Sequence, residues 1–335
     1  MISEIIGKLI ARQNLSHEEM KSTMDTIMDG QCTNAQIGAF LATLRAKGET
    51  IEEISAAVEV LRAKASIVPV SKPNVIDTCG TGGDHSGSFN ISTASAIIAA
   101  GAGVPVAKHG NKAMSSSCGS ANVLQELGLN LDLTPEQVGE SIDKYNIGFL
   151  FAMKLHSAMR YVGPARQELA QRTIFNILGP MLNPANAKRQ IIGVFDPELL
   201  MTLATVLQKT GSERVMIVHG NDGLDEISLT STTQVAELKD GKISQYEINP
   251  EELGLKLCST DDLKGGSPTD NANIIRDILK GDKGPKRDIC LLNAAAALYI
   301  AGVADDLPQG MQKAAEAIDS GAAQKTLDDF IAFSG

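Results

Sequence analysis

A glycine-rich segment and the basic loop that follows it carry the residue types best suited to binding phosphate. The segment Asp77–Thr93 reads DTCGTGGDHSGSFNIST after a short apolar run, and 108–111 reads KHGN after the apolar run 104–107. Glycine lets the backbone approach a ligand closely, and free amides beside a helix start bind anions. Open α/β sheets bind ligands at the carboxyl ends of their strands, so the two loops together favour a phosphate site. The glycine segment alone is also compatible with a structural turn.

The glycine segment matches neither common nucleotide-binding fingerprint. A dinucleotide fingerprint that begins at Gly80 requires a third glycine where His85 stands, and a Walker loop that begins at Gly82 requires lysine where Ser88 stands. We therefore expect Lys108, in the next loop, to supply positive charge for phosphate oxygens. A solvent-exposed loop without a ligand is the alternative for that basic segment.

An acidic segment follows another predicted strand, 214–218. It reads DGLDE over 222–226, so three carboxylates lie within five residues. Mg²⁺ bound jointly with substrate phosphates would relieve their repulsion, and Asp225 and Glu226 are the candidate ligands. An acidic surface turn is the alternative. The histidines and cysteines lack zinc-ligand spacing, so a zinc site is not indicated.

Arginines recur every six residues, at Arg160, Arg166 and Arg172, in the stretch 156–176, which we expect to be helical. This spacing does not follow one helix face, so at most one or two of them face a shared site. A guanidinium group suits a carboxylate ligand, whereas a surface or ion-pairing role is the default. Because no nucleophile motif is present, the combined features suit transfer at an activated sugar carbon, which needs a held leaving group and a positioned acceptor.

Residues 1–68 are predicted to be helical. Gly30 and Gly48 stand where two of the helices should end. Each of three capping boxes opens a segment with apolar residues three or four positions apart, namely Ser16–Glu19, Thr33–Gln36 and Thr50–Glu53.

From residue 75 the pattern alternates between strand and helix, which predicts a mainly parallel sheet. The expected strands are 74–77, 104–107, 147–151, 190–195 and 214–218, followed by a hairpin of 234–238 and 242–248. The expected helices are 90–100, 118–127, 135–145, 198–209, 270–280 and 287–301, with two short helices after Pro308.

The composition is that of an ordinary α/β protein, with 335 residues, 43% hydrophobic residues and 31 glycines. A formal charge of −10 argues against broad nucleic-acid binding, and an anionic substrate would require local lysines or a metal ion. The apolar run 94–106 is too short to span a membrane, and we identify no signal peptide. Five cysteines without a C-x-x-C pair favour reduced thiols in the cytoplasm over catalytic ones.

Taken together, the motifs resemble those of the anthranilate phosphoribosyltransferases, in the same order and spacing along nearly the whole chain. They are GTGGD at 80–84, NIST at 90–93, KHGN at 108–111, GPAR at 163–166, TIFN at 173–176 and DE at 225–226. The resemblance implies Mg²⁺-dependent transfer of phosphoribose from phosphoribosyl pyrophosphate to the amine of anthranilate, a step of tryptophan biosynthesis. It also implies a homodimer formed through the helical part, with no nucleic-acid or membrane partner.

The fold implied by this resemblance is α/β, with a small all-helical N-terminal domain hinged to a larger α/β domain. The larger domain has a mainly parallel central sheet flanked by helices. The helical domain would comprise residues 1–70 and a returning segment at about 164–184, and the α/β domain, which binds phosphoribosyl pyrophosphate, would comprise 71–163 and 185–335.

The resemblance also implies three groups of site residues. Those for phosphoribosyl pyrophosphate are Gly80, Gly83, Asp84, Ser88, Asn90, Ile91, Ser92, Thr93, Lys108, His109, Gly110, Asn111, Lys112, Ala113, Met114, Ser115, Ser116 and Ser120. Those for anthranilate are Gly80, Asn111, His156 and Arg166, with Arg166 at the carboxylate, and those for Mg²⁺ are Ser92, Asp225 and Glu226. The chain departs from the usual family residues at Ser88, Asn122 and Ser157, which stand where threonine, aspartate and proline are common; of the assignments, only the His156 contact is affected.

Two rival functions belong to other specificities of the same fold. Pyrimidine nucleoside phosphorylases carry a Lys-His-Ser run before the glycine loop, where this chain has Asp77-Thr78-Cys79. A non-catalytic, nucleic-acid-binding paralogue is the second alternative, and the acidic balance and the Asp225–Glu226 pair argue against it.

Overall fold

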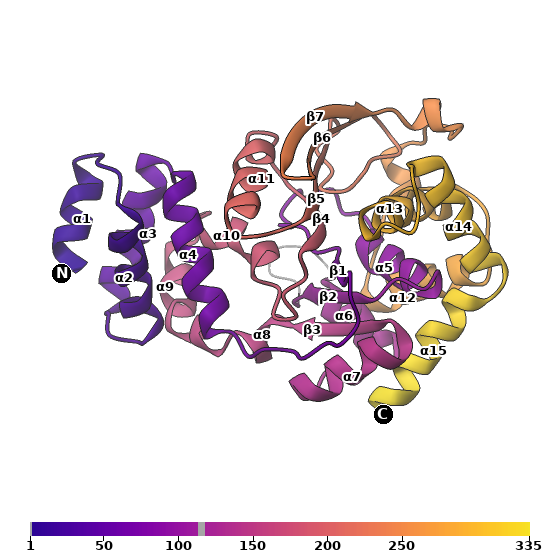
Figure 1. Cartoon of the computed structure of the whole chain (residues 1–335), viewed down its shortest axis with the longest axis horizontal. Helices are drawn as coiled ribbons and strands as arrows, with labels where there is room; N and C mark the ends of the chain where they lie inside the picture. Colours follow the sequence, from indigo (N-terminus) through magenta and orange to yellow (C-terminus); the bar gives the residue numbers. More distant parts are fainter. Residues whose placement is uncertain (1, 113–117) are drawn as a thin grey trace.

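The computed structural model describes residues 2–112 and 118–335, and the N-terminal helices form a bundle at one end of the molecule (Figure 1). These helices are α1 (Ile2–Ile10), α2 (His17–Met28), α3 (Asn34–Lys47) and α4 (Ile51–Lys64). All three predicted capping boxes are present, with Ser16, Thr33 and Thr50 each accepting the backbone N–H three residues on. These bonds satisfy amides that have no partner within the helix. Gly30 and Gly48 adopt positive φ just beyond α2 and α3, as predicted.

In the described residues, a seven-stranded sheet has the order β3-β2-β1-β4-β5-β6-β7. The strands are β1 (Ile76–Asp77), β2 (Val106–Gly110), β3 (Ile147–Phe151), β4 (Arg189–Gly193), β5 (Arg214–Gly220), β6 (Thr233–Lys239) and β7 (Lys242–Ile248). Strands β1 to β5 are parallel and β6 and β7 form an antiparallel hairpin, so the mainly parallel sheet is confirmed. Because β1, β2, β4 and β5 run in one direction, their carboxyl ends meet at one edge of the sheet.

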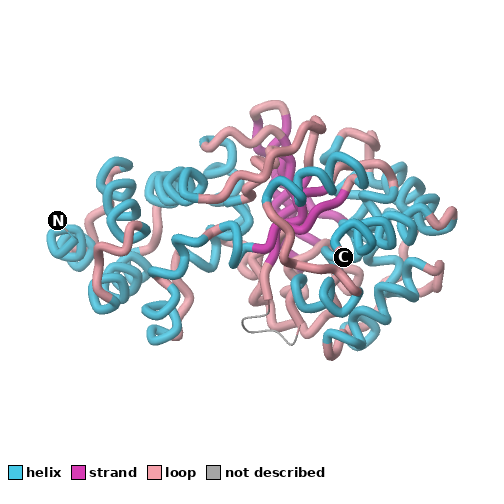
Figure 2. Tube along the Cα trace, turned by 90° about the horizontal axis from the view of Figure 1, so that it is seen from below, coloured by secondary structure: helices cyan, strands magenta, loops and turns pink. Residues whose placement is uncertain are grey.

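Helices cover both faces of the sheet (Figure 2). Neighbouring residues of one strand enter different apolar clusters, as Ile191 and Ile192 do, because side chains alternate between the faces. On one face lie α5 (Ile91–Gly101), α13 (Pro285–Ala301), α14 (Leu307–Asp319) and α15 (Ala322–Ser334), with α6 (Ser120–Leu127) and α12 (Pro268–Leu279) beside them. On the other face lie α7 (Pro135–Tyr145) and α11 (Leu199–Lys209).

The stretch 156–176, predicted as helical, is broken into short pieces. A 3₁₀ turn (Ser157–Tyr161) precedes α9 (Gly163–Leu169), which ends at Ala170 in the left-handed conformation (φ 48°). Pro164 fits the first turn of α9, where its missing N–H costs nothing, but it cannot lie inside a longer helix. The prediction of one helical stretch was therefore wrong in its continuity. On either side lie α8 (Ala152–Leu155), α10 (Phe175–Leu178) and the 3₁₀ turn Gly179–Leu182.

The two helices predicted as short, α14 and α15, each span 13 residues.

The N-terminal bundle and the sheet share one continuous apolar cluster. Val162 and Ile174 lie in it together with Phe40 of α3 and Ile192 of β4. Arg62 adds a polar link, because its Nε donates to Met181 O (2.7 Å) and its Nη1 to Thr210 O (3.0 Å). Within the described residues, no helix is both long and apolar enough to cross a membrane.

Candidate functional site

The glycine loop leaves β1 and is pressed against the end of β4. Thr81 N donates to Gly193 O (2.8 Å), and a Cβ on Gly80 would lie 3.0 Å from the same carbonyl oxygen. Gly82 and Gly83 adopt positive φ (65° and 82°), which side-chain-bearing residues rarely do. The glycines are therefore required by the path of the loop, which brings its backbone to the carboxyl edge of the sheet.

Lys108 lies beneath this loop rather than in solvent. It is only 3% exposed, and its Nζ lies 3.3 Å from Thr78 O, Thr78 Oγ1 and Ser92 Oγ. The alternative of a solvent-exposed lysine is thus contradicted. Lys108 places one positive charge between the glycine loop and the start of α5, where Ser92 lies.

The acidic segment after β5 reaches the same place. Glu226 Oε1 accepts a hydrogen bond from Ser92 N (3.1 Å), and Asp225 N lies 3.5 Å from Asp84 Oδ2. A Cβ on Gly193 would lie 1.5 Å from Asp225 O, so only glycine lets the acidic segment cross the end of β4. The structure therefore brings together the Asp84, Lys108, Asp225 and Glu226 side chains.

The carboxylates of Asp84, Asp225 and Glu226 repel one another in this partly enclosed space. Burial, together with the Asp84 and Glu226 charges, raises the pKa of Asp225 well above its ordinary value. Burial also raises the pKa of Glu226 to about 7, despite the opposing effect of Lys108. A cluster that holds more negative charge than its lysine can neutralise, with a serine oxygen beside it, fits a hard divalent cation such as Mg²⁺.

Other acidic and metal-ligating side chains nearby have structural roles. Asp222, the third carboxylate of the acidic segment, accepts from Ser228 Oγ (2.7 Å) and bonds Thr230 within its own turn. Asp77, Cys79 and His109 offer ligand atoms within 4.8 Å of one another. However, Asp77 already accepts hydrogen bonds from Asn183 Nδ2 and His109 N, and the positive charge of Lys108 lies nearby, so a cation there is disfavoured.

Asp77 and Asn183 form a buried hydrogen-bonded link that sequence reasoning missed. Asn183 Nδ2 donates to Asp77 Oδ2 (2.7 Å) and to Ala107 O (2.8 Å), and Asp77 Oδ1 accepts from His109 N (3.0 Å). Burial raises the pKa of Asp77 to about 6, against the lowering effect of Asn183. This link holds the ends of β1 and β2 in register beneath the loops. The sequence feature that could have indicated this link is Asp77, an aspartate at the end of a buried strand.

We expect Asn183→Ala to destabilise the fold by roughly 2–4 kcal/mol, because it leaves Asp77 Oδ2 and Ala107 O buried without their donor. Urea unfolding measures this change. The matched control is Asn273→Ala, since Asn273 contacts the exposed Arg276 side chain, and it should change the free energy of unfolding by less than about 0.5 kcal/mol. Equal effects of the two substitutions would contradict the structural role of Asn183.

His109 and His156, predicted to contact different substrates, form one buried pair. Their Nε2 atoms lie 3.1 Å apart, and the ring centroids are 5.1 Å apart. Burial lowers the pKa of His109 to about 3 and that of His156 to about 4, so both rings are neutral at pH 7 and one Nε2 donates to the other. The pair therefore presents a neutral, polar wall rather than a positive charge.

Acid should destabilise the protein through this pair. Both pKa values lie below the ordinary 6.5, so the stabilisation from keeping the rings neutral is present above pH 6.5 and is lost as pH falls toward 4. Each histidine accounts for up to about 1.4 kcal/mol per pH unit. Urea unfolding at several pH values should show a shallower loss for His156→Phe than for the wild type. His85→Asn is the control, because His85 is exposed and its positive φ tolerates asparagine; it should leave the slope unchanged.

The three arginines have different surroundings. Arg160 donates to the neighbouring Tyr161 hydroxyl (2.8 Å), and Arg172 donates to Gly83 O. The Arg166 guanidinium lies 5.2 Å from the centroid of the Phe175 ring, and burial lowers its pKa. Arg166 has no ion-pair or hydrogen-bond partner for its side chain among the described residues, so its donors are available to a ligand.

The remaining predicted residues have mixed positions. Asn90 is committed to neighbours, since Nδ2 donates to Cys118 O (3.1 Å) and Oδ1 accepts from Asn271 (3.0 Å). Ser120 Oγ donates to Asn111 O (3.4 Å). Ser88 pairs with Lys264, and Lys112 is exposed. Ile91 and Thr93 are buried, Gly110 is half-buried, and Ala113, Met114, Ser115 and Ser116 lie outside the described residues.

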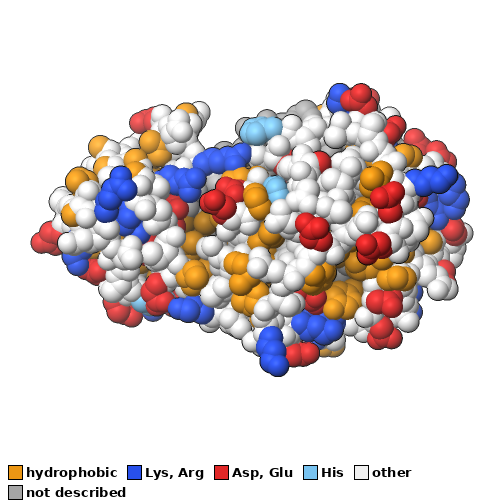
Figure 3. All heavy atoms as spheres, turned by 90° about the horizontal axis from the view of Figure 1, so that it is seen from above, with side chains coloured by type: hydrophobic (Ala, Val, Ile, Leu, Met, Phe, Trp, Pro, Cys, Tyr) orange, Lys and Arg blue, Asp and Glu red, His pale blue; other side chains and the backbone are white. Residues whose placement is uncertain are grey.

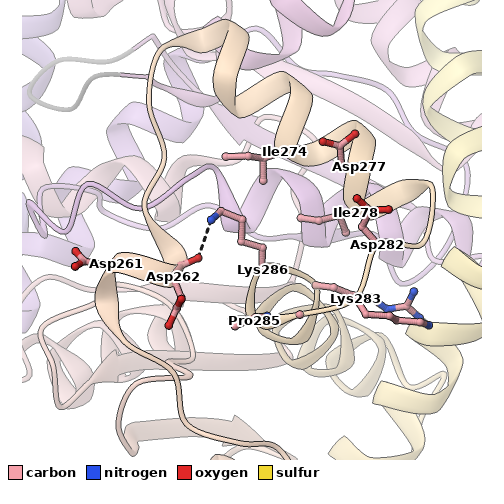
Figure 4. Close-up of a pocket in the computed structure, with 11 residues that line it drawn as sticks. Asp261, Asp262, Ile274, Asp277, Ile278, Asp282, Lys283, Pro285 and Lys286 are labelled. Carbon is pink, nitrogen blue, oxygen red and sulfur yellow. Dashed lines mark hydrogen bonds between the residues drawn. The ribbon is translucent and has the colours of Figure 1, made fainter.

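Surface views separate an indentation beside the bundle from an unrelated pocket. On the face drawn in Figure 3, the surface is indented between the N-terminal helices and the larger part, with basic, acidic and histidine side chains beside it. The pocket of about 440 Å³ in Figure 4 lies elsewhere, between α12 and the start of α13. Its lining includes Asp261, Asp277 and Lys286 but none of the predicted site residues.

Two family models match this chain, one over the N-terminal helices and one over the larger part. A family model described as "Glycosyl transferase family, helical bundle domain" matches residues 3–65, and one described as "Glycosyl transferase family, a/b domain" matches residues 72–324. The fold and the site thus define a glycosyltransferase of this two-part class.

Individual relatives narrow the class further. An anthranilate phosphoribosyltransferase of Alkaliphilus metalliredigens is 52% identical over 100% of this chain and 98% of its own. The crystal structure of the Thermus thermophilus anthranilate phosphoribosyltransferase is 42% identical, with a TM-score of 0.93 over 98% of each chain. The Saccharomyces cerevisiae enzyme in complex with phosphoribosyl pyrophosphate and Mg is 27% identical, with a TM-score of 0.91 over 99% of this chain and 97% of that one. The chain belongs to the anthranilate phosphoribosyltransferase family.

Proposed function

We propose that this protein transfers 5-phosphoribose from phosphoribosyl pyrophosphate to the amine of anthranilate, giving N-(5-phosphoribosyl)anthranilate and pyrophosphate in tryptophan biosynthesis. The observation that supports this most is the meeting of the glycine loop, Lys108 and the Asp225–Glu226 pair at the ends of parallel strands. Arg166, whose guanidinium lies over the Phe175 ring and has no hydrogen-bond or ion-pair partner in the described part of the chain, supplies a fork for the acceptor's carboxylate.

The reaction needs alignment more than acid–base chemistry. The neutral aromatic amine attacks C1 of the ribose, the C1–N bond forms, and the C1–O bond to pyrophosphate breaks. The amine then releases its proton to water. The chain's backbone amides at 80–84 and the Lys108 charge hold the diphosphate, while Arg166 orients the acceptor. Bound Mg²⁺ supplies neutralisation of the diphosphate charge.

We propose these residue assignments on the basis of the positions above. Among the described residues, phosphoribosyl pyrophosphate contacts Gly80, Gly83, Asp84, Ser88, residues 90–93, residues 108–112 and Ser120. Ser92, Asp225 and Glu226 would hold Mg²⁺. Gly80, Asn111, His156 and Arg166 line the anthranilate side, where the neutral His109–His156 pair suits an uncharged aromatic amine.

Anthranilate fluorescence tests this function directly. Addition of phosphoribosyl pyrophosphate and Mg²⁺ to the protein should decrease it as product forms. Thymidine or uridine with phosphate should give no free base, and a labelled oligonucleotide should not be retained at physiological salt. Phosphorolysis without loss of anthranilate would favour the nucleoside phosphorylase alternative, and oligonucleotide retention without turnover would favour the non-catalytic one.

We also propose a division into the helical unit 1–70 with the returning segment 164–184 and the α/β unit 71–163 with 185–335. The apolar cluster that Ala165 and Ile174 share with Phe40 supports the returning segment. A cytoplasmic homodimer formed through the helical unit completes the proposal. Ile10 of α1, which is 68% exposed, is a candidate contact there. Sedimentation of the wild type and of Ile10→Asp tests this interface, since a monomeric wild type would exclude it.

A further inference from the structure

Arg172 links the segment after α9 to the glycine loop. Its Nη2 donates to Gly83 O (2.5 Å), a residue 89 positions earlier in the sequence. The guanidinium carbon lies 3.8 Å from the centroid of the Phe195 ring, so the planar group rests on an aromatic face. Both contacts depend on the planar, forked shape of arginine.

The contact with Gly83 fixes one peptide unit of the loop. A trans peptide is planar, with its C=O and N–H pointing in opposite directions, so holding Gly83 O also sets the direction of the Asp84 N–H. Gly83 has positive φ, and a Cβ there would lie 3.3 Å from Arg172 Nη2. Because residue 83 is glycine, no side chain of the loop occupies the space next to the Arg172 guanidinium.

A second contact fixes the same loop at its other side. Thr81 N and Thr81 Oγ1 both donate to Gly193 O (2.8 and 3.2 Å) at the end of β4. Phe195, the platform beneath Arg172, lies two residues beyond Gly193. The glycine loop is thus held between the end of β4 and an arginine that stacks on the residues just after it.

The charge of Arg172 is not neutralised by a carboxylate. In the described residues its side chain forms no ion pair, and Gly83 O is its only hydrogen-bond partner. This positive charge lies beside a loop that faces a diphosphate, so it attracts the diphosphate. It does not compete with the Asp225–Glu226 pair, because that pair is negative and does not bind the diphosphate directly.

We propose that Arg172 is a positioning residue for phosphoribosyl pyrophosphate, which holds the Gly83–Asp84 peptide in the orientation that the diphosphate requires. This inference rests on the proposed function. It separates two arginines six residues apart: Arg166 serves the acceptor, and Arg172 serves the glycine loop.

Hydrogen exchange on the ligand-free protein tests the clamp without any substrate. Amides of residues 81–88 should exchange at least about tenfold faster in Arg172→Ala than in the wild type, because the loop loses one of the contacts that fix its backbone. Arg172→Lys should exchange nearly as fast, since an ammonium group lacks the planar fork. The matched control, Arg160→Ala, removes an arginine that donates to Tyr161 and forms no hydrogen bond with the glycine loop among the described residues, so the loop of this variant should exchange like the wild type. Unchanged exchange in Arg172→Ala would overturn the proposal, even if the proposed reaction is confirmed.

Steady-state kinetics tests the consequence. Arg172→Ala should raise the KM for phosphoribosyl pyrophosphate by about tenfold or more, while the KM for anthranilate stays within about twofold. Phe195→Leu, which removes the platform but keeps the charge, should give an intermediate rise. A rise confined to the KM for anthranilate would overturn the proposal and place Arg172 with Arg166. Faster loop exchange in a protein without transferase activity would retain the clamp and refute the proposed function instead.

Discussion

The double variant Asp225→Asn, Glu226→Gln loses at least about 1,000-fold in kcat/KM, and its residual activity no longer responds to Mg²⁺. Each charged ligand contributes roughly 1.5–3 kcal/mol to holding the cation, and the loss of about 4 kcal/mol from the two corresponds to a factor of about 1,000. Calorimetric titration of Mg²⁺ with phosphoribosyl pyrophosphate measures the loss of binding independently of turnover.

Stability measurements distinguish this role from a structural one. Without metal, the buried like charges destabilise the wild type, so the double variant should unfold at the same temperature or higher at pH 8. Mg²⁺ should raise the melting temperature of the wild type but not that of the double variant. The control Asp222→Asn alters a carboxylate committed to its own turn, so it should keep the Mg²⁺ response. A metal titration of the double variant that matched the wild type would refute the assignment.

The effect of pH on metal binding has a definite sign. The pKa of Glu226 is raised to about 7, and protons compete with the cation for the carboxylate. The apparent affinity for Mg²⁺ should therefore fall as pH decreases below 7. In the metal-free protein, the stabilisation associated with this raised pKa is present below the ordinary value of 4.5 and is lost as pH rises through 7.

Arg166→Ala should raise the KM for anthranilate by about 10- to 100-fold, which corresponds to the roughly 1.5–3 kcal/mol of a charge-assisted hydrogen bond. The KM for phosphoribosyl pyrophosphate should change little, because the Arg166 side chain forms no hydrogen bond or ion pair with the glycine loop among the described residues. Arg166→Lys should restore only part of the loss, since a lysine cannot form the bidentate pair with a carboxylate. Initial rates over an anthranilate series provide the measurement.

An analogue makes the test specific to the carboxylate. Aniline has the amine but lacks the carboxylate, so the wild type should use it far less efficiently than anthranilate. In Arg166→Ala, this preference should shrink by the same factor as the rise in KM. If the preference for anthranilate survives the substitution, another residue binds the carboxylate. Arg160→Ala, which alters an arginine beside Tyr161, should leave the preference intact.

Most elements were predictable because their signals are local. A capping box such as Ser16–Glu19 needs only residues within one helical turn, and all three predicted boxes are present. The strands β1 to β5 appear where apolar runs predicted them. The continuous helix over 156–176 was wrong because Pro164 begins a new helix rather than continuing one.

The residue types needed for phosphate, metal and carboxylate binding, their order and the elements that carry them were set by the sequence alone. Only the tertiary structure decided which atoms meet. It buries Lys108 beneath the loop, pairs His109 with His156, and directs Arg172 to Gly83, while Arg166 has no hydrogen-bond partner for its side chain within the described residues. The physical reason is that these contacts join residues tens of positions apart, and their geometry depends on how parallel strands pack rather than on any local preference.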